Sequence, residues 1–309
     1  MRVIFFGTPE FAVPSFRALL AHGIQVAAVV TQPDKPQGRS RSTLVPPPVK
    51  RAALEAGVPV LQPERPVGDV FVTSLRHLRP RPDLGVVVAY GHILRPEILE
   101  IPPLGMINVH ASLLPRYRGA APIQWAILNG ETETGVSIMQ MDPGLDSGPV
   151  LLRVPTAIGP DETAGELSER LAEMGATALI EAIGLIARGE AKPEPQDHAA
   201  ATYAPKVDRE AARLSFDVSA AVAARKIRAF DPSPGAWAVL DGTPVKLFGG
   251  RVVSGGGRPG QVLAASRSLV VACAENALEI AEVQPAGKPR LPADAWARGR
   301  AVRVGDTFE

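Results

Sequence analysis

Three polar side chains that can do chemistry together stand in two short segments of the chain. Asn108 and His110 end an apolar run that is typical of a buried strand, and Asp146 follows later in a Gly-rich loop. Because residues two apart share a face of a strand, we expect the amide and the imidazole to project side by side. The loop can return the carboxylate of Asp146 to the imidazole.

An amide, an imidazole and a carboxylate suit the transfer of a carbonyl carbon to an amine. Negative charge develops on the carbonyl oxygen as the amine attacks, and both Asn108 and a protonated His110 can donate hydrogen bonds to that oxygen. Asp146 would favour the protonated imidazole and could relay the proton that the amine loses. The residues alone leave a structural alternative open, since Asn and His at a strand end can simply cap backbone groups.

The elements that must position these residues follow a regular rhythm. Short apolar runs alternate with helical patterns as far as about residue 188, which predicts a doubly wound, mostly parallel α/β sheet. The longest helix is expected at Ala164–Arg188, and Gly7 is not followed by the glycines that a dinucleotide site requires. Strands are expected at Val3–Phe6, Val26–Val30, Val58–Leu61, Leu84–Ala89, Gly105–Val109 and Val136–Met141.

The composition changes after the long helix. Prolines, small residues and scattered charges in residues 190–205 predict a linker. Beyond it a helix is expected at Ser219–Ala229, followed by five short strands that fit a small barrel. We therefore predict a catalytic domain at 1–189, a linker at 190–205 and a second domain at 206–309. The five strands are expected at Ala236–Leu240, Val245–Phe248, Gln261–Ala265, Leu269–Cys273 and Leu278–Val283.

Composition argues against several classes of protein. A single cysteine, Cys273, allows no internal disulfide, which favours a reducing, cytoplasmic compartment. The 5 histidines show no ligand spacing, so no metal is expected. The first apolar run is too short for the core of a secretory signal, and no stretch approaches the roughly 20 apolar residues of a membrane span.

Two groups of basic residues predict contacts with an anionic partner. Residues 206–309 carry 15 Lys and Arg against 11 Asp and Glu, and residues 35–51 hold five basic residues and no acidic one. Such side chains contact the phosphates of a nucleic acid. Segment 35–51 contains Gly38 and the run Pro46–Pro48 and is predicted to be a long loop. Solvated surface charge is the alternative for both groups, whose candidate residues are Lys35, Arg39, Arg41, Lys206, Arg225, Arg228 and Lys288.

Long segments of the chain resemble the folate-dependent formyltransferase family, and within it the branch that acts on methionyl-tRNA. His110–Gly119 (HASLLPRYRG) is similar to the signature of that family, and Met139–Gly148 (MQMDPGLDSG) to its matching loop. Tyr117 stands where the family often has Trp. The resemblance runs nearly end to end, because further landmarks are found at Phe6–Phe11, Thr31–Asp34, Val88–Gly91, Arg228–Phe230 and Gln284–Lys288.

The resemblance implies a Rossmann-like catalytic domain followed by an OB-like domain that binds tRNA. It implies that 10-formyltetrahydrofolate donates a formyl group to the α-amine of initiator methionyl-tRNA, without a metal, and that Asn108, His110 and Asp146 are catalytic. A monomer is expected. The nearest alternative acceptor is the amine of a sugar nucleotide, and a binding module without chemistry is the alternative from another class.

The resemblance also implies binding roles for individual residues. Phe11 would line the pocket for the methionyl side chain, and the basic segment 35–51 would reach the acceptor arm of the tRNA. For Ile93, Leu113 and Leu114 the alternative is packing in the hydrophobic core. Folate contacts are implied for Tyr90, Ile93, Ser112, Leu113, Leu114, Pro115 and Asp142.

The basic segment leads to a first prediction. We expect Arg39→Ala combined with Arg41→Ala to weaken the use of charged tRNA and to flatten its salt dependence, because fewer counterions are released when fewer phosphates are contacted. Kinetics with charged tRNA at several salt concentrations, together with folate binding, measure this. Wild-type tRNA kinetics at every salt concentration would mean that the segment is solvated surface, and lost folate binding would mean that it supports the cleft instead.

Overall fold

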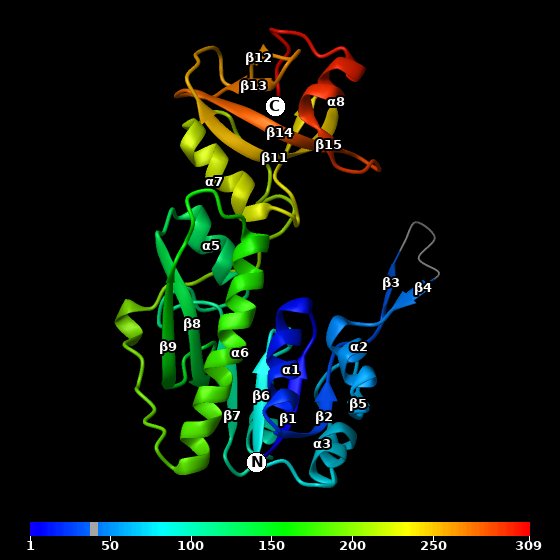
Figure 1. Cartoon of the computed structure of the whole chain (residues 1–309), viewed down its shortest axis with the longest axis vertical. Helices are drawn as coiled ribbons and strands as arrows, with labels where there is room; N and C mark the ends of the chain where they lie inside the picture. The colour runs from blue at the N-terminus through cyan, green and yellow to red at the C-terminus, as the bar shows by residue number, and fades with distance from the viewer. Residues whose placement is uncertain (38–42) are drawn as a thin grey trace. The chain divides into compact units, whose positions relative to one another are not determined.

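The computed structural model describes residues 1–37 and 43–309, which form two compact units (Figure 1). Unit 1 contains Met1–Pro122, Glu133–Ala157 and Ser168–Ala204, and unit 2 contains Ile123–Thr132, Ile158–Leu167 and Pro205–Glu309. Helix α6 (Ala164–Arg188), which begins and ends where the sequence predicted, therefore starts in unit 2 and continues in unit 1. The domain boundaries predicted from the sequence, at residues 189/190 and 205/206, stay a prediction.

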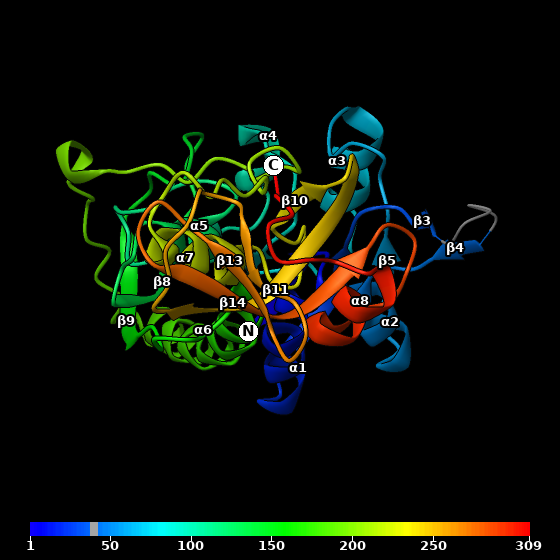
Figure 2. The ribbon, with the colours of Figure 1, turned by 90° about the horizontal axis from the view of Figure 1, so that it is seen from above.

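Unit 1 is built on a seven-stranded sheet in the order β5-β2-β1-β6-β7-β8-β9 (Figures 1 and 2). The first five of these strands are parallel, whereas β8 and β9 run antiparallel to their neighbours. This confirms the mostly parallel sheet, and only β9 was not predicted, because Arg153 and Pro155 interrupt its apolar run. The strands are β1 (Arg2–Gly7), β2 (Gln25–Val30), β5 (Val60–Leu61), β6 (Leu84–Val88), β7 (Met106–His110), β8 (Glu133–Gln140) and β9 (Val150–Ala157).

Helices cover both faces of this sheet, because alternate residues of each buried strand point to opposite sides. Phe6 packs in a cluster with residues of α3 and α4. Its neighbour Phe5 faces the other way and meets Phe16 of α1, with ring centroids 5.6 Å apart. The helical segments that belong wholly to unit 1 include η1 (Glu10–Ala12), α1 (Val13–Ala21), α2 (Pro48–Glu55), α3 (Asp69–Arg76) and α4 (Pro96–Leu99).

The basic segment 35–51 is not a continuous loop, so that prediction was wrong. β3 (Lys35–Gln37) and β4 (Thr43–Val45) pair as an antiparallel hairpin that projects from the sheet of unit 1 (Figure 1), and α2 begins directly after them. Three-residue strands are too short to show a period, and a proline at the first turn is compatible with a helix. Lys50 on α2 forms an ion pair of 2.8 Å with Asp34. Arg39 and Arg41 lie outside the described residues.

Unit 2 is built on an antiparallel sheet in the order β10-β11-β14-β13-β12, with β15 beside β14 (Figures 1 and 2). The two edge strands are joined by residues 305–309. Val239 on β10 exchanges two backbone hydrogen bonds of 2.8 Å with Glu309, and Val262 on β12 bonds to Gly305 and Asp306 at 2.9 and 2.8 Å. This closes the sheet into a small barrel-like structure, as predicted.

Within residues 206–309 the elements agree with the sequence except near the end, and α5 of unit 2 was not predicted. α7 begins after Ser219, whose hydroxyl accepts the N–H of Val222 at 3.4 Å. β15 and α8 were not predicted. No helix within residues 1–37 and 43–309 is long and apolar enough to cross a membrane. The elements are α5 (Pro122–Leu128), η2 (His198–Ala200, in unit 1), α7 (Ala220–Phe230), β10 (Trp237–Leu240), β11 (Thr243–Val253), β12 (Val262–Ala264), β13 (Leu269–Ala272), β14 (Ala277–Pro285), β15 (Leu291–Pro292) and α8 (Ala293–Arg300).

Phe308, in the closing segment, carries a prediction about stability. Its ring is 2% exposed and packs against Phe216 and Trp296. We expect Phe308→Ala to lower the free energy of unfolding of unit 2 by about 3–5 kcal/mol, because a cavity replaces the ring. All 3 tryptophans lie in unit 2, so urea unfolding followed by tryptophan fluorescence reports on it. Thr307→Ala, at an exposed neighbour, is the matched control, and equal unfolding midpoints for the two variants would contradict the packing role.

Candidate active site

Asn108 and His110 lie on one face of β7, as predicted. Asn108 is the one half-buried residue of this strand, whereas the side chain of His110 is 6% exposed. β7 is paired with β6 on one side and β8 on the other. The backbone of both residues is therefore held by neighbouring strands, and Asn108 alone among the residues of β7 is partly open to a ligand.

Two neighbours hold the ring of His110. Its Nε2 lies 2.9 Å from the carbonyl oxygen of Tyr117, and because a carbonyl only accepts, Nε2 is the nitrogen that carries the hydrogen there. Its Nδ1 lies 3.8 Å from Oδ2 of Asp146. That distance exceeds a hydrogen bond but gives a strong attraction once the ring is charged. Nδ1 is thus the nitrogen that remains for a reacting group.

The carboxylate of Asp146 is fixed by the backbone of Gly119, whose N–H donates to the same Oδ2 at 2.8 Å. Gly119 has a φ of 120°, and a Cβ there would lie 2.7 Å from the carbonyl oxygen of Ala204, so only glycine fits. The signature segment and the loop between β8 and β9 therefore meet at this carboxylate. The structure therefore places the carboxylate of Asp146 beside the imidazole of His110, as predicted.

The loop that carries Asp146 must turn back to reach the imidazole. β8 ends beside Ile107, three residues before His110, because the two strands are antiparallel. At about 3.3 Å per residue this leaves about 10 Å to cover along β7. Asp146 itself has a φ of 48°, in the left-handed region. The position of its carboxylate therefore depends on contacts that hold a folded-back loop.

Ser137, which the sequence analysis missed, ties the start of the signature to β8. It pairs with His110 across the sheet and is fully buried. Its hydroxyl donates to the carbonyl oxygen of Ser112 at 2.7 Å and accepts the N–H of Leu114 at 3.0 Å. A hydroxyl between the apolar residues Val136 and Ile138 of a buried strand is the signal that could have revealed it, since buried polar groups need partners.

Comparison with known proteins identifies the family. Residues 1–183 match the family model described as formyl transferase, and residues 206–301 match the formyl transferase C-terminal domain. The chain belongs to the formyltransferase family. It is 47% identical over 306 residues to the methionyl-tRNA formyltransferase of Citrifermentans bemidjiense, which covers 99% of this chain and 95% of that protein. It is 48% identical over 308 residues to that of Neisseria meningitidis serogroup C, covering 99% of both chains.

Solved structures of other proteins share the fold. HypX from Aquifex aeolicus, crystallised with tetrahydrofolic acid, matches with a TM-score of 0.71 at 19% identity; the match covers 99% of this chain and 48% of that longer one. WlaRD, a sugar 3N-formyl transferase determined in the presence of dTDP and 5-N-formyl-THF, matches with a TM-score of 0.67 at 16% identity, covering 94% and 99%. At these identities the likeness shows the fold alone.

The residues that the formyltransferase resemblance links to folate divide by burial. Tyr90 packs against Phe6, and burial raises its pKa to about 12. The hydroxyl of Ser112 donates a hydrogen bond to the carbonyl oxygen of Arg116 at 2.6 Å, and Leu114 packs in a buried cluster. These three side chains are buried, so a ligand meets mainly the backbone at those positions, and the hydroxyl of Tyr90 has no hydrogen-bond partner among the described residues.

The remaining predicted folate residues are accessible. Leu113, Pro115 and Asp142 are half-buried, and Ile93 is 82% exposed. The carboxylate of Asp142 accepts from the hydroxyl of Ser147 at 2.9 Å and thereby orders its own loop. Within the described residues, no group of three or more His, Cys, Asp or Glu side chains is placed to hold a metal.

The basic residues predicted to contact tRNA differ in solvent exposure and in their hydrogen-bond partners. Lys35, Lys206 and Lys288 are exposed. Arg228 donates to the carbonyl oxygen of Glu162 at 3.1 Å, and burial lowers the pKa of its guanidinium. Arg225 has a buried Nε without a hydrogen-bond partner among the described residues. The two arginines line a pocket of about 150 Å³ in unit 2.

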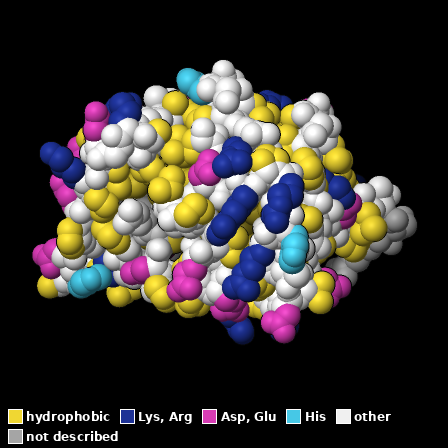
Figure 3. Space-filling model, turned by 90° about the horizontal axis from the view of Figure 1, so that it is seen from below, with side chains coloured by type: hydrophobic (Ala, Val, Ile, Leu, Met, Phe, Trp, Pro, Cys, Tyr) yellow, Lys and Arg dark blue, Asp and Glu magenta, His cyan; other side chains and the backbone are white. Residues whose placement is uncertain are grey.

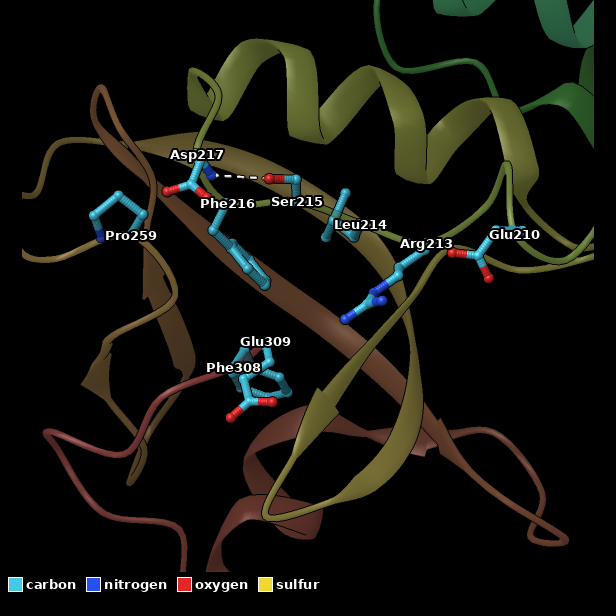
Figure 4. Close-up of a pocket in the computed structure, with 9 residues that line it drawn as sticks. All are labelled: Glu210, Arg213, Leu214, Ser215, Phe216, Asp217, Pro259, Phe308 and Glu309. Atoms are coloured by element: carbon cyan, nitrogen blue, oxygen red, sulfur yellow. Dashed lines mark hydrogen bonds between the residues drawn. The ribbon is translucent and has the colours of Figure 1, made fainter.

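Unit 2 has a further pocket, of about 440 Å³, into which Arg213 extends (Figure 4). The guanidinium groups of Arg213 and Arg209 both lie over the ring of Trp237, at 5.6 and 5.2 Å from its centroid. Lys and Arg side chains also gather on the face shown in Figure 3. Charge alone therefore does not locate an RNA surface.

The geometry of Asn108 leads to a prediction about catalysis. We expect Asn108→Ala to lower kcat for formyl transfer by about 100-fold or more, because a preorganised donor to the developing negative charge is lost. Steady-state kinetics measure this, and an unchanged melting temperature shows that the fold is retained. A near-normal kcat would contradict the assigned role.

Proposed function

We propose that this chain transfers the formyl group of 10-formyltetrahydrofolate to the α-amine of methionine charged on initiator tRNA. The observation that carries the proposal is the similarity, along nearly the whole chain, to proteins named methionyl-tRNA formyltransferase, at 44–48% identity. The site supports it, because Asn108, His110 and Asp146 lie together as acyl transfer to an amine requires. The cytoplasm, where charged tRNA is used, is the expected compartment.

The transfer needs no protein nucleophile, since a neutral amine is itself nucleophilic. Its nitrogen attacks the formyl carbon, a new carbon–nitrogen bond forms, and the bond from that carbon to N10 of the folate breaks. The amine nitrogen loses one proton and N10 gains one. The amide of Asn108 and a protonated Nδ1 of His110 donate to the formyl oxygen while it carries negative charge.

Asp146 supports this chemistry through its position beside Nδ1 of His110. Its carboxylate, 3.8 Å away, stabilises the imidazolium and lies within reach of a water that carries the proton of the amine. Because Gly119 fixes the same oxygen, the carboxylate is already in place before the substrates arrive. Little rearrangement is then needed during the reaction.

The folate donor is proposed to lie against the loops that follow β6 and β8. Ile93 and Leu145 are 82% and 56% exposed on these loops, and a flat apolar ring would cover them. Backbone groups of the segment from Ser112 to Pro115 would meet the polar edge of the pterin. Asp142 would contribute through the loop that it orders.

The tRNA is proposed to contact both units through phosphates. Lys35, Lys206 and Lys288 are exposed, and the half-buried Arg225 belongs to the same proposal. Arg39 and Arg41, outside the described residues, belong to the same proposal. Arg228 has carbonyl partners already, so we assign it a role in holding α7. Phe11, half-buried in η1, is proposed to line the methionyl pocket, and the chain is proposed to act as a monomer.

Single-turnover formyl transfer tests the proposed function. The enzyme is mixed with 10-formyltetrahydrofolate and, in parallel, with methionyl initiator tRNA, free methionine or a dTDP-linked amino sugar. We expect rapid formation of N-formylmethionyl-tRNA and transfer at least about 100-fold slower to the other two acceptors, since these make few phosphate contacts. Preferential formylation of the amino sugar, or binding of charged tRNA without transfer, would contradict the proposal.

A further inference from the structure

Segment 196–204, which lies between α6 and unit 2 in the sequence, contacts both loops of the active site. The side-chain N–H groups of Gln196 donate to the carbonyl oxygens of Asp146 and Gly148, at 2.9 and 2.7 Å. Its Oε1 accepts from Nε and Nη2 of Arg118, at 3.1 and 2.7 Å. Gln196 is 6% exposed and Arg118 is 4% exposed. One buried amide thus joins the signature segment to the loop of Asp146.

The choice of an amide at this position has a chemical reason. The guanidinium of Arg118 is buried, and its hydrogen bonds within the described residues go to neutral groups, namely Gln196 and Nδ1 of His198 at 3.2 Å. A carboxylate in place of the amide would pair more strongly with this cation. It would have no hydrogen to donate to the two loop carbonyls. Only an amide accepts from Arg118 at one end and donates to the loop at the other.

The two loops that segment 196–204 contacts contain residues with left-handed backbone. Asp146 has a φ of 48° and Tyr117, whose carbonyl receives Nε2 of His110, has a φ of 59°. Such conformations persist where the surroundings hold them. Gln196 bonds to the backbone of Asp146, and the hydroxyl of Thr202 accepts the N–H of Tyr117 at 2.8 Å. Both neighbours of the His110 ring are therefore supported from this one segment.

We propose that Gln196 is a positioning residue for catalysis, with its amide oriented by Arg118. It holds the folded-back loop so that the carboxylate of Asp146 stays beside Nδ1 of His110. This inference rests on the proposed role of Asp146 in formyl transfer. Gln196 bonds to the backbone at Asp146 and Gly148, whereas Asp142, in the part of the loop proposed to meet the folate, is held by Ser147. The loss of Gln196 therefore changes the chemical step more than the binding of the formyl donor.

A double-mutant cycle with Gln196→Glu and Asp146→Asn tests the proposal. Gln196→Glu keeps the shape and the contact with Arg118 but removes both donated hydrogen bonds. We expect kcat to fall about 10-fold or more, with the KM for 10-formyltetrahydrofolate within about 2-fold of wild type. The double variant should be no slower than Asp146→Asn alone, because both changes act through the same carboxylate. Gln25→Glu, which adds the same charge at an exposed position, should leave kcat unchanged.

Additive losses in the cycle, or a raised KM with an unchanged kcat, would overturn the proposal. If Gln196→Glu does not fold, Arg118→Met combined with Gln196→Met removes the buried polar pair without leaving an unpaired charge. This variant should fold and show the same loss of kcat, and wild-type kcat would overturn the proposal. All assays use whichever amine the wild-type enzyme formylates, so a wrong acceptor in the proposed function does not affect the outcome.

Discussion

The active site depends on one contact, in which the carboxylate of Asp146 accepts the N–H of Gly119 and lies beside the ring of His110. It joins the segment after β7 to the loop after β8. The rest of unit 1 serves to bring these segments together. β7 fixes the two donors of the site, β8 anchors the signature through Ser137, and segment 196–204 supports both loops. A preorganised carboxylate is the result.

The site is made of rigid strands and strained loops in defined places. Asn108 and His110 stand on a strand paired on both sides, so their backbone has little freedom. Asp146 lies on a loop in a left-handed conformation, which the strands alone would not hold. Catalysis by donors aimed at a developing charge requires that they do not reorganise during the reaction. The buried amide of Gln196 holds the loop of Asp146, which is the least rigid part of the site, so that the carboxylate does not reorganise.

Much of this could be predicted from the sequence, because local patterns encode it. Apolar runs marked six strands of the sheet, and residue type with strand alternation marked Asn108 and His110. Arg118 and Gln196 could not be found in this way, since their roles arise from hydrogen bonds between residues far apart in the chain. The paired strands β3 and β4 were missed because each is three residues long. The burial of Tyr90 likewise follows from tertiary packing that no local pattern shows.

Amide hydrogen exchange at Gly119 tests the central claim most directly. In the wild-type protein this N–H is bonded to the carboxylate of Asp146, and it should exchange slowly. In Asp146→Ala it should exchange faster, whereas the N–H of Tyr117, bonded to Thr202, should stay slow. Equal protection of the Gly119 amide in both proteins would contradict the account, because the carboxylate would then not be held where catalysis needs it.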